Sequence, residues 1–176
     1  QLKGAPNFVP GVMALILLIV CVMMTAIAIV KEKETGTMEI LLVSPMKPSF
    51  VIIAKAVPYF ILSMLIVLVI LILSYFLLDL PIKGSLILLL FVSTIFILTN
   101  LLIGILISIF VKTQQQAMLI SLIATMLPTL MLSGFMFPIE NMPIPLQVVS
   151  NIIPAKWYYI MIKNIMIKGT GISIIW

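Results

Sequence analysis

The sequence predicts an all-α fold: a polytopic integral membrane helical bundle with four complete spans and the start of a fifth. Of the 176 residues, 64% are hydrophobic and only 9% are charged, so a water-soluble globule would lack the polar surface to cover itself. Four runs carry no charge and reach the roughly 20 residues that cross a hydrocarbon core of about 30 Å. Lipid offers no partners for free backbone amides, so each run is expected to be helical.

Proline and glycine mark the joints between these spans. Pro10 and Gly11 are expected to open the first span, and Pro58 lies in the first turn of the second. The chain lacks an initial methionine and a signal-peptide pattern, so we expect one transmembrane domain, residues 1–176, from a longer protein. The predicted segments are spans at 12–30, 56–78, 85–111 and 117–137, a charged elbow at 31–55, an external loop at 138–171, and the start of another span at 172–176.

The elbow begins with KEKETGTMEILLVSP, residues 31–45, directly after an uncharged span. Gly36 is expected to break the first helix, and Thr37 to cap a new helix that ends at Pro45. A helix of two turns is marginal in water, so this amphipathic helix needs a surface to lie on. Its apolar residues fall at i, i+3 and i+4, on one face: Met38, Leu41 and Leu42.

Two interpretations of that surface stay open. The helix could lie on lipid headgroups, or it could dock against a cytosolic partner with Leu41 and Leu42 in a groove. Short cytoplasmic loops retain lysine. Five lysines fall on each side of the predicted bundle, but four of them lie in the single connection 31–55, which is therefore assigned to the cytoplasm. For a docked helix the acids would supply anionic contacts: Glu32, Glu34 and Glu39.

Two stretches resemble one known family. KEKETGTMEILLVSPMKPSFVIIAK, followed by a span with PYF at its start, is similar to the cytoplasmic loop of ATP-binding-cassette (ABC) permeases of the type-2 exporter class, in which a KE…GTME.LL.SP pattern is typical. LSGFMFPIENMPIPLQVVSNIIPAKWYY, residues 132–159, is similar to the last external loop of that family. The resemblance implies a six-span permease of the cell (inner) membrane, paired with a second copy or a related permease.

The resemblance also implies separate ABC ATPase subunits docked on the cytoplasmic side. This chain would bind no cofactor itself, because ATP would sit on the partner subunit. The family often has arginine where Lys31, Lys33 and Lys156 stand here; lysine keeps the charge but loses the bidentate pairing geometry. The residues expected to couple to the ATPase are Glu32, Glu34, Gly36, Thr37, Met38, Glu39 and Leu42, with Leu41 added from the apolar face.

Small and hydroxylated residues recur at intervals of four in two spans. Such faces let helices approach closely and bond through hydroxyls. Alternatively, a stripe lines a transport path or the seam of a permease dimer, with Pro128 bending the helix. No ionisable residue lies well within a span, which argues against a proton relay. The stripes are Asn100, Gly104 and Ser108 in the third span, and Ala117, Ser121, Thr125, Thr129 and Ser133 in the fourth.

The external loop is rich in Ile, Val, Trp and Tyr and poor in charge, so it is expected to be ordered. Prolines divide it into two short apolar, re-entrant helices, residues 146–153 and 157–167, which dip into the outer leaflet with their aromatic residues at the headgroups. The resemblance implies that these helices form the outer lid of an exporter. The candidate lid residues are Pro138, Glu140, Pro154 and Trp157.

The sequence contains no recognisable catalytic set. It has no histidine or arginine, no GxxxxGK[ST] loop for phosphates, and one cysteine, Cys21, which cannot form a thiolate metal site within the chain. The scattered lysines form no stripe for nucleic acid. We therefore expect a non-enzymatic permease that exports a hydrophobic or amphipathic compound, of drug, lipid or glycan-lipid type, powered by a separate ATPase. The alternative is a membrane scaffold, or a membrane-embedded enzyme subunit, that recruits another soluble partner.

Overall fold

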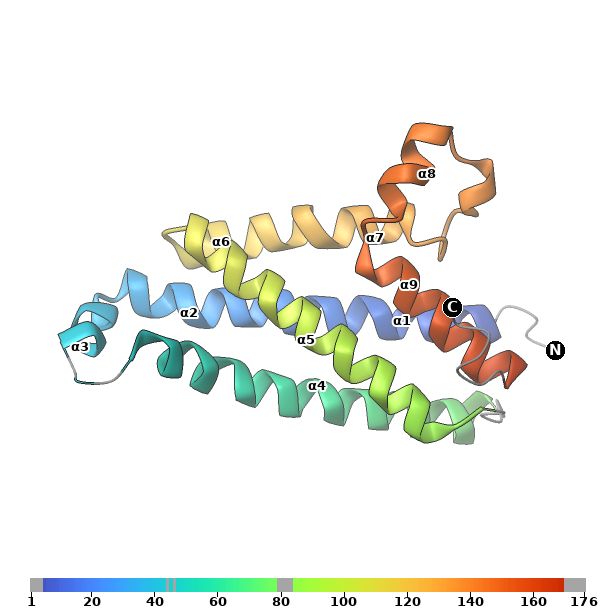
Figure 1. Cartoon of the computed structure of the whole chain (residues 1–176), viewed down its shortest axis with the longest axis horizontal. Coiled ribbons are helices and arrows are strands. Elements are labelled where there is room, and N and C mark those ends of the chain that lie inside the picture. Colours follow the sequence, from blue (N-terminus) through green and yellow to red (C-terminus); the bar gives the residue numbers. More distant parts are fainter. Residues whose placement is uncertain (1–4, 44, 46, 79–83, 170–176) are drawn as a thin grey trace.

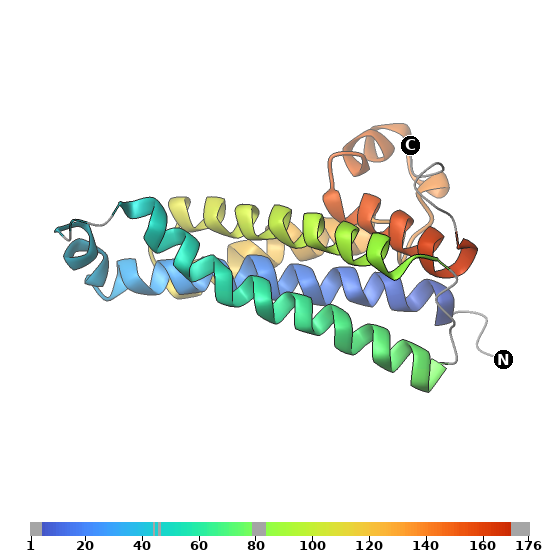
Figure 2. The ribbon, with the colours of Figure 1, turned by 60° about the horizontal axis from the view of Figure 1, so that its bottom comes forward.

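The computed structural model describes residues 5–43, 45, 47–78 and 84–169. Within these ranges all regular elements are helical, and four helices are long and apolar enough to cross a membrane: Phe8–Glu34, Pro48–Phe76, Leu86–Phe110 and Gln114–Leu132. They run up and down in chain order and form an elongated bundle (Figures 1 and 2). The predicted all-α bundle with four spans is thus confirmed. The predicted start of a fifth span, 172–176, lies outside the described residues.

The first helix is the centre of the bundle. It consists of α1 (Ala5–Leu18), a π-helical stretch η1 (Ile19–Met24) and α2 (Thr25–Glu34). The helix begins at Ala5, so Pro10 and Gly11 lie inside it and do not open it. Gly11 has a different use, because a Cβ there would lie 2.0 Å from the ring of Phe135, which packs against the helix.

The elbow contains one short helix, α3 (Thr37–Val43). Gly36 separates it from α2 with a φ of 74°, a conformation that favours glycine, as predicted for this break. The hydroxyl of Thr37 donates to the Glu32 carbonyl at 3.3 Å. The next helix, α4 (Pro48–Leu78), begins before the predicted span, so Pro58 lies in its interior instead of its first turn and removes one backbone donor there.

The third and fourth long helices complete the bundle. The third, α5 (Leu86–Phe110), covers nearly the whole run predicted at 85–111. The fourth consists of α6 (Gln114–Ser121), η2 (Leu122–Met126) and α7 (Leu127–Leu132). Thr113 caps it, since its hydroxyl accepts from the Gln116 N–H at 3.3 Å. It ends at Leu132 and not at residue 137, and Gly134 then adopts a φ of 80°.

Two short helices, α8 (Ile144–Ser150) and α9 (Pro154–Lys163), occupy the segment predicted to be an external loop, together with η3 (Ile139–Asn141) and η4 (Asn164–Lys168). The helix α9 packs against α1 and α5. Tyr158 and Tyr159, two of the loop aromatic residues predicted at the headgroups, pack within the bundle and are only 2% and 6% exposed. Trp157 does remain exposed. We call this end of the bundle the lid end, and the end that carries α3 the elbow end.

Burial is uneven among the long helices. The first helix has 50% of its most apolar stretch buried, whereas the second and fourth each have 17%. The first helix contacts α4, α5 and α6, which surround it (Figure 1). The second and fourth long helices therefore leave long apolar faces open to their surroundings, as lipid-facing helices do.

Candidate functional site

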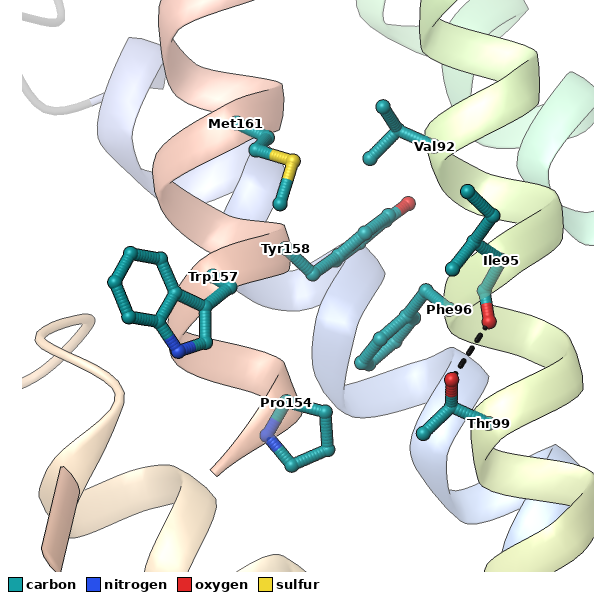
Figure 3. Close-up of a pocket in the computed structure, with 8 residues that line it drawn as sticks. All are labelled: Val92, Ile95, Phe96, Thr99, Pro154, Trp157, Tyr158 and Met161. Atoms are coloured by element: carbon teal, nitrogen blue, oxygen red, sulfur yellow. Dashed lines mark hydrogen bonds between the residues drawn. The ribbon is translucent and has the colours of Figure 1, made fainter. Parts of the chain in front are cut away.

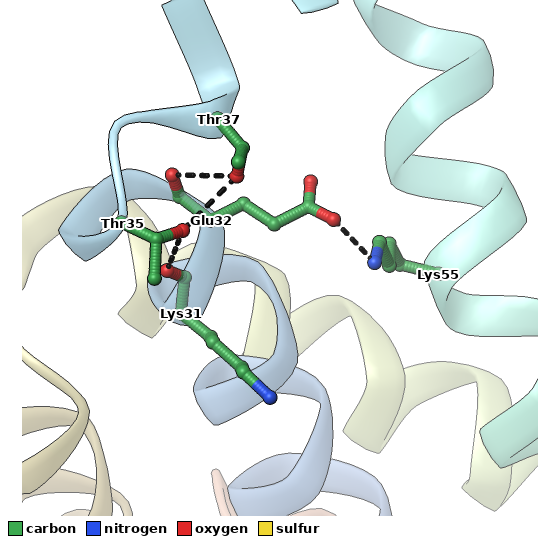
Figure 4. Close-up of polar contacts among 5 residues, drawn as sticks. All are labelled: Lys31, Glu32, Thr35, Thr37 and Lys55. Carbon is green, nitrogen blue, oxygen red and sulfur yellow. Dashed lines mark hydrogen bonds and ion pairs between the residues drawn. The ribbon is translucent and has the colours of Figure 1, made fainter.

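Residues at the end of α2 bind the neighbouring helices. The Glu32 carboxylate pairs with the Lys55 ammonium of α4 at 2.5 Å (Figure 4). The next residue, Lys33, donates from its ammonium to the Ser108 carbonyl of α5 at 2.5 Å. Ser108 lies in the last turn of α5, where carbonyls lack helical partners and carry partial negative charge. A cation is therefore favourable there.

The third consecutive residue, Glu34, binds the beginning of α6. Its carboxylate accepts from the backbone N–H and from the side-chain amide of Gln114, both at 3.0 Å. The first N–H groups of a helix are unpaired and carry partial positive charge, so an anion is favourable there. We call these contacts of Glu32, Lys33 and Glu34 the clasp. The clasp joins the first helix to each of the other three long helices at the elbow end.

The helix α3 projects from the elbow end (Figure 1), and two of its apolar side chains are exposed. Ile40 is 72% exposed and Val43 is 88% exposed, and their i, i+3 spacing places them on one side. Glu39, directly before Ile40, is also exposed, while Met38 is half-buried. The side chains of Leu41 and Leu42, which the sequence assigns to a groove, lie outside the described part of the structure. Ile40, Val43 and Glu39 thus form an exposed patch on α3.

The predicted coupling residues differ in their surroundings. Glu32 and Glu34 are occupied by contacts within the chain. Gly36 lies in the turn between α2 and α3, and Thr37 is the first residue of α3, with its hydroxyl 3.0 Å from the Thr35 hydroxyl. Of the three acids, only Glu39 has no polar partner among the described residues. A direct role in contacting an ATPase remains a prediction for all of them.

The stripe of the third span faces the first helix. A Cβ at Gly104 would lie 2.7 Å from the Val22 carbonyl oxygen and 3.1 Å from the Thr25 side chain. Asn100 is fully buried and Ser108 is 2% exposed. This placement allows the two backbones to approach closely, as small residues at a helix interface do.

The stripe of the fourth span is also mostly buried. Ser121, Thr129 and Ser133 are at most 2% exposed and Ala117 is fully buried, whereas Thr125 is half-buried and donates to the Ser121 carbonyl at 2.5 Å. The helix α6 contacts α2, and η2 contacts η1. The assignment of either stripe to a transport path or dimer seam stays a prediction, and it requires these helices to part.

Several buried polar atoms between the helices have no partner within the described ranges: Thr25 Oγ1, Ser74 Oγ, Asn100 Oδ1 and Ser121 Oγ. An unpaired buried polar atom costs about 1–3 kcal/mol. Three of these side chains lie on the first, third and fourth long helices, near the π-helical stretches η1 and η2. The helix interfaces there are less stable than fully paired ones, so parting them would cost less.

At the lid end, a cavity of about 200 Å³ opens between α5 and α9 (Figure 3). The ring of Tyr158 stacks on that of Phe96 with a centroid distance of 4.1 Å, and its hydroxyl lies 3.1 Å from that of Ser93. Two predicted lid residues, Pro154 and Trp157, line the cavity. The others, Pro138 and Glu140, are exposed before α8. The full lining is Val92, Ile95, Phe96, Thr99, Pro154, Trp157, Tyr158 and Met161.

Lys156 ties the two short helices together. It is only 8% exposed, and its ammonium donates to Ser150 Oγ at 3.0 Å and to Asn151 Oδ1 at 2.5 Å. Both acceptors lie at the C-terminal end of α8, where a cation is favourable. The indole N–H of Trp157 adds a bond to the Asn151 carbonyl at 2.9 Å.

Sequence reasoning missed the partners of the residues that it singled out. Ile40 and Val43 carry a signal, since their spacing puts them on one helix face. Lys55 and Gln114 carry none, because only the tertiary arrangement brings them to α2. Tyr158 was misplaced because a buried aromatic residue and a headgroup anchor look alike in a sequence.

Comparisons with known proteins point in one direction. The family described as "ABC-2 family transporter protein" matches residues 1–176. The chain is 35% identical to the probable multidrug ABC transporter permease YbhS of Escherichia coli, over 92% of the chain and 43% of the relative. It is 33% identical to the inner membrane transport permease YhhJ of Escherichia coli, over 100% of the chain and 49% of the relative. A more distant relative, 25% identical, is ABC transporter G family member 20 of Dictyostelium discoideum, with 96% and 24% covered.

The chain therefore spans less than half the length of these curated relatives. No solved structure matches it. Together with the four long apolar helices, the relatives show a multi-pass membrane protein.

Proposed function

The chain belongs to the ABC-2 transporter family, and from this premise we propose that it is the membrane-spanning permease of an ABC exporter. In this proposal a separate ATPase docks at the elbow end on the cytoplasmic side of the inner membrane. The exported compound is hydrophobic or amphipathic. The relative YbhS, a probable multidrug ABC transporter permease, supports that class. A second permease copy, or a related permease, completes the transporter.

The observation that carries the proposal is the elbow itself. A short helix, α3, presents Ile40, Glu39 and Val43 to the outside, and the clasp directly before it binds α4, α5 and α6. A displacement of α3 would therefore act on the ends of all four long helices. A partner can shift the bundle from one arrangement to another only if it binds the two arrangements with different affinity.

In the proposed mechanism, ATP-driven closure of the cytosolic subunits moves α3 and the clasp as one unit. The bundle responds where its helix interfaces are weakest, next to the unpaired buried oxygens of Thr25, Asn100 and Ser121. The long helices rock, and the lid formed by α8 and α9 moves at the opposite end. This chain contains the transport path and transmits the movement of α3 to the long helices, and the ATPase supplies the energy.

The test measures co-purification of the ATPase with the full-length permease, and transport by the two proteins reconstituted together. A permease with Ile40→Asp and Val43→Asp places charge where α3 would contact an apolar groove, and we expect co-purification of the ATPase and transport to fall at least tenfold. The matched control is Val148→Asp, which changes a similarly exposed apolar residue on the short helix at the other end. Undiminished co-purification and transport in the doubly substituted permease would contradict the proposed docking role of α3.

A further inference from the structure

A second cavity, of about 570 Å³, lies at the elbow end between α2, α3, α4 and α6. Its lining comprises Met24, Ile27, Ala28, Lys31, Glu32, Thr35, Thr37, Lys55, Tyr59 and Gln114. It differs from the cavity between α5 and α9 because charged and apolar side chains both line it.

The polarity of the cavity changes in one direction along both of its main walls. On the first helix, Met24 and Ile27 lie deeper in the bundle, and Lys31 lies about 10 Å beyond Met24 and about 6 Å beyond Ile27 toward the elbow end. These residues are separated by three and four positions, so they share one face. On α4, Tyr59 lies deeper and Lys55 lies one turn closer to the elbow end. The floor is thus apolar and the rim is charged.

The rim has an excess of positive charge. It contains the two lysines Lys31 and Lys55 and one acid, Glu32, which is paired with Lys55. The Lys31 side chain extends away from that ion pair (Figure 4). Its ammonium has no polar partner among the residues that the structure describes. An anion at the rim would therefore meet one unpaired cation and a second cation beside it.

We propose that this cavity binds an anionic phospholipid of the bilayer, with its headgroup at Lys31 and an acyl chain along Met24, Ile27 and Tyr59. The direction of the polarity change matches a lipid whose headgroup faces the membrane surface at the elbow end and whose tail points to the midplane. Lysines near the surface attract anionic lipids by about 1 kcal/mol each, equivalent to about fivefold in binding. The inference needs a membrane-embedded chain but does not rest on the proposed export function.

The lipid would also act on the clasp. Its headgroup competes with Glu32 for Lys55, so bound lipid would weaken the contact between α2 and α4. Occupancy and release of the cavity would then change how tightly the elbow is held to the second long helix.

The experiment uses the full-length protein in bilayer nanodiscs without nucleotide. The probe is phosphatidylglycerol with a photoreactive diazirine in its acyl chain, and the comparison probe is phosphatidylcholine with the same chain. Mass spectrometry of the cross-linked peptides maps the sites. We expect phosphatidylglycerol to label residues 24–28 and Tyr59 about fivefold more than phosphatidylcholine does.

Two variants must change this labelling in opposite directions. Lys31→Gln removes the unpaired cation and should lower phosphatidylglycerol labelling about fivefold, whereas Glu32→Gln frees Lys55 and should raise it about twofold or more. A variant that merely misfolds would lower labelling, so a rise with Glu32→Gln cannot come from lost structure. The control, Lys112→Gln, changes an exposed lysine at the same end that does not line the cavity. Equal labelling by the two lipids, or equal effects of Lys31→Gln and Lys112→Gln, would overturn the proposal.

Discussion

Glu32, Lys33 and Glu34 are consecutive in the sequence, yet each binds a different helix. Successive residues of an α-helix point about 100° apart, so three in a row fan out over more than half of the helix circumference. Such a fan can contact three neighbours only if the helix is surrounded by them. The central position of the first helix therefore explains why alternating charges at this place are useful.

A charge exchange tests the first contact of the clasp. Glu32→Lys and Lys55→Glu should each lower the midpoint of thermal unfolding in detergent, because each places like charges about an ion-pair distance apart. The double variant should recover most of the lost stability. We expect the loss in unfolding free energy to be about 1 kcal/mol or less for a partly exposed pair. If the stability losses of the two single variants simply add in the double variant, the two side chains do not interact.

Gly104 permits the close approach of α5 to the first helix. Gly104→Val should destabilise the protein by about 1–3 kcal/mol, because its new side chain meets the Val22 backbone. The thermal unfolding midpoint of the purified protein in detergent measures the effect. Ala54→Val, which enlarges an exposed side chain on α4, serves as the control. If both variants unfold at the same temperature as the parent protein, the interface is looser than described.

At the scale of elements, the helices could be predicted better than their ends. The four apolar runs fixed the spans, and the φ of Gly36 confirms the break before α3. Pro10 and Pro58 were mistaken for helix starts, although both lie inside helices, since a long transmembrane helix held by its neighbours tolerates proline. The π-helical stretches η1 and η2 could not be predicted, because nothing in an uncharged run distinguishes them.

The tie between α8 and α9 yields a prediction for the lid. Lys156→Met keeps the length of the side chain and removes the bonds to Ser150 and Asn151. We expect faster amide hydrogen exchange in residues 144–150, by about tenfold or more, with little change in α5, because α9 keeps its stacked contact of Tyr158 on Phe96. Unchanged exchange in α8 would mean that other contacts hold it in place.

At the scale of the whole molecule, the sequence could not tell which helix is central. The four long helices are mostly apolar, so hydropathy alone does not separate their lipid-facing faces from their buried faces. The polar stripes did mark buried faces, as Asn100, Ser121 and Thr129 show. The clasp and the cavity at the elbow end could not be predicted, because their residues come from different helices.

Docking of a cytosolic ATPase on α3 requires the elbow end to face the cytoplasm. The direct measurement is labelling with a membrane-impermeant maleimide in the full-length protein with Cys21→Ala and without other cysteines. Single cysteines are placed by Val43→Cys in α3 and by Asn141→Cys, an exposed residue before α8. If the elbow end faces the cytoplasm, the maleimide added to intact cells labels only the Asn141→Cys protein, and the Val43→Cys protein reacts only after the membrane is opened. Labelling of the Val43→Cys protein in intact cells would contradict this orientation, since no cytosolic ATPase could then reach α3.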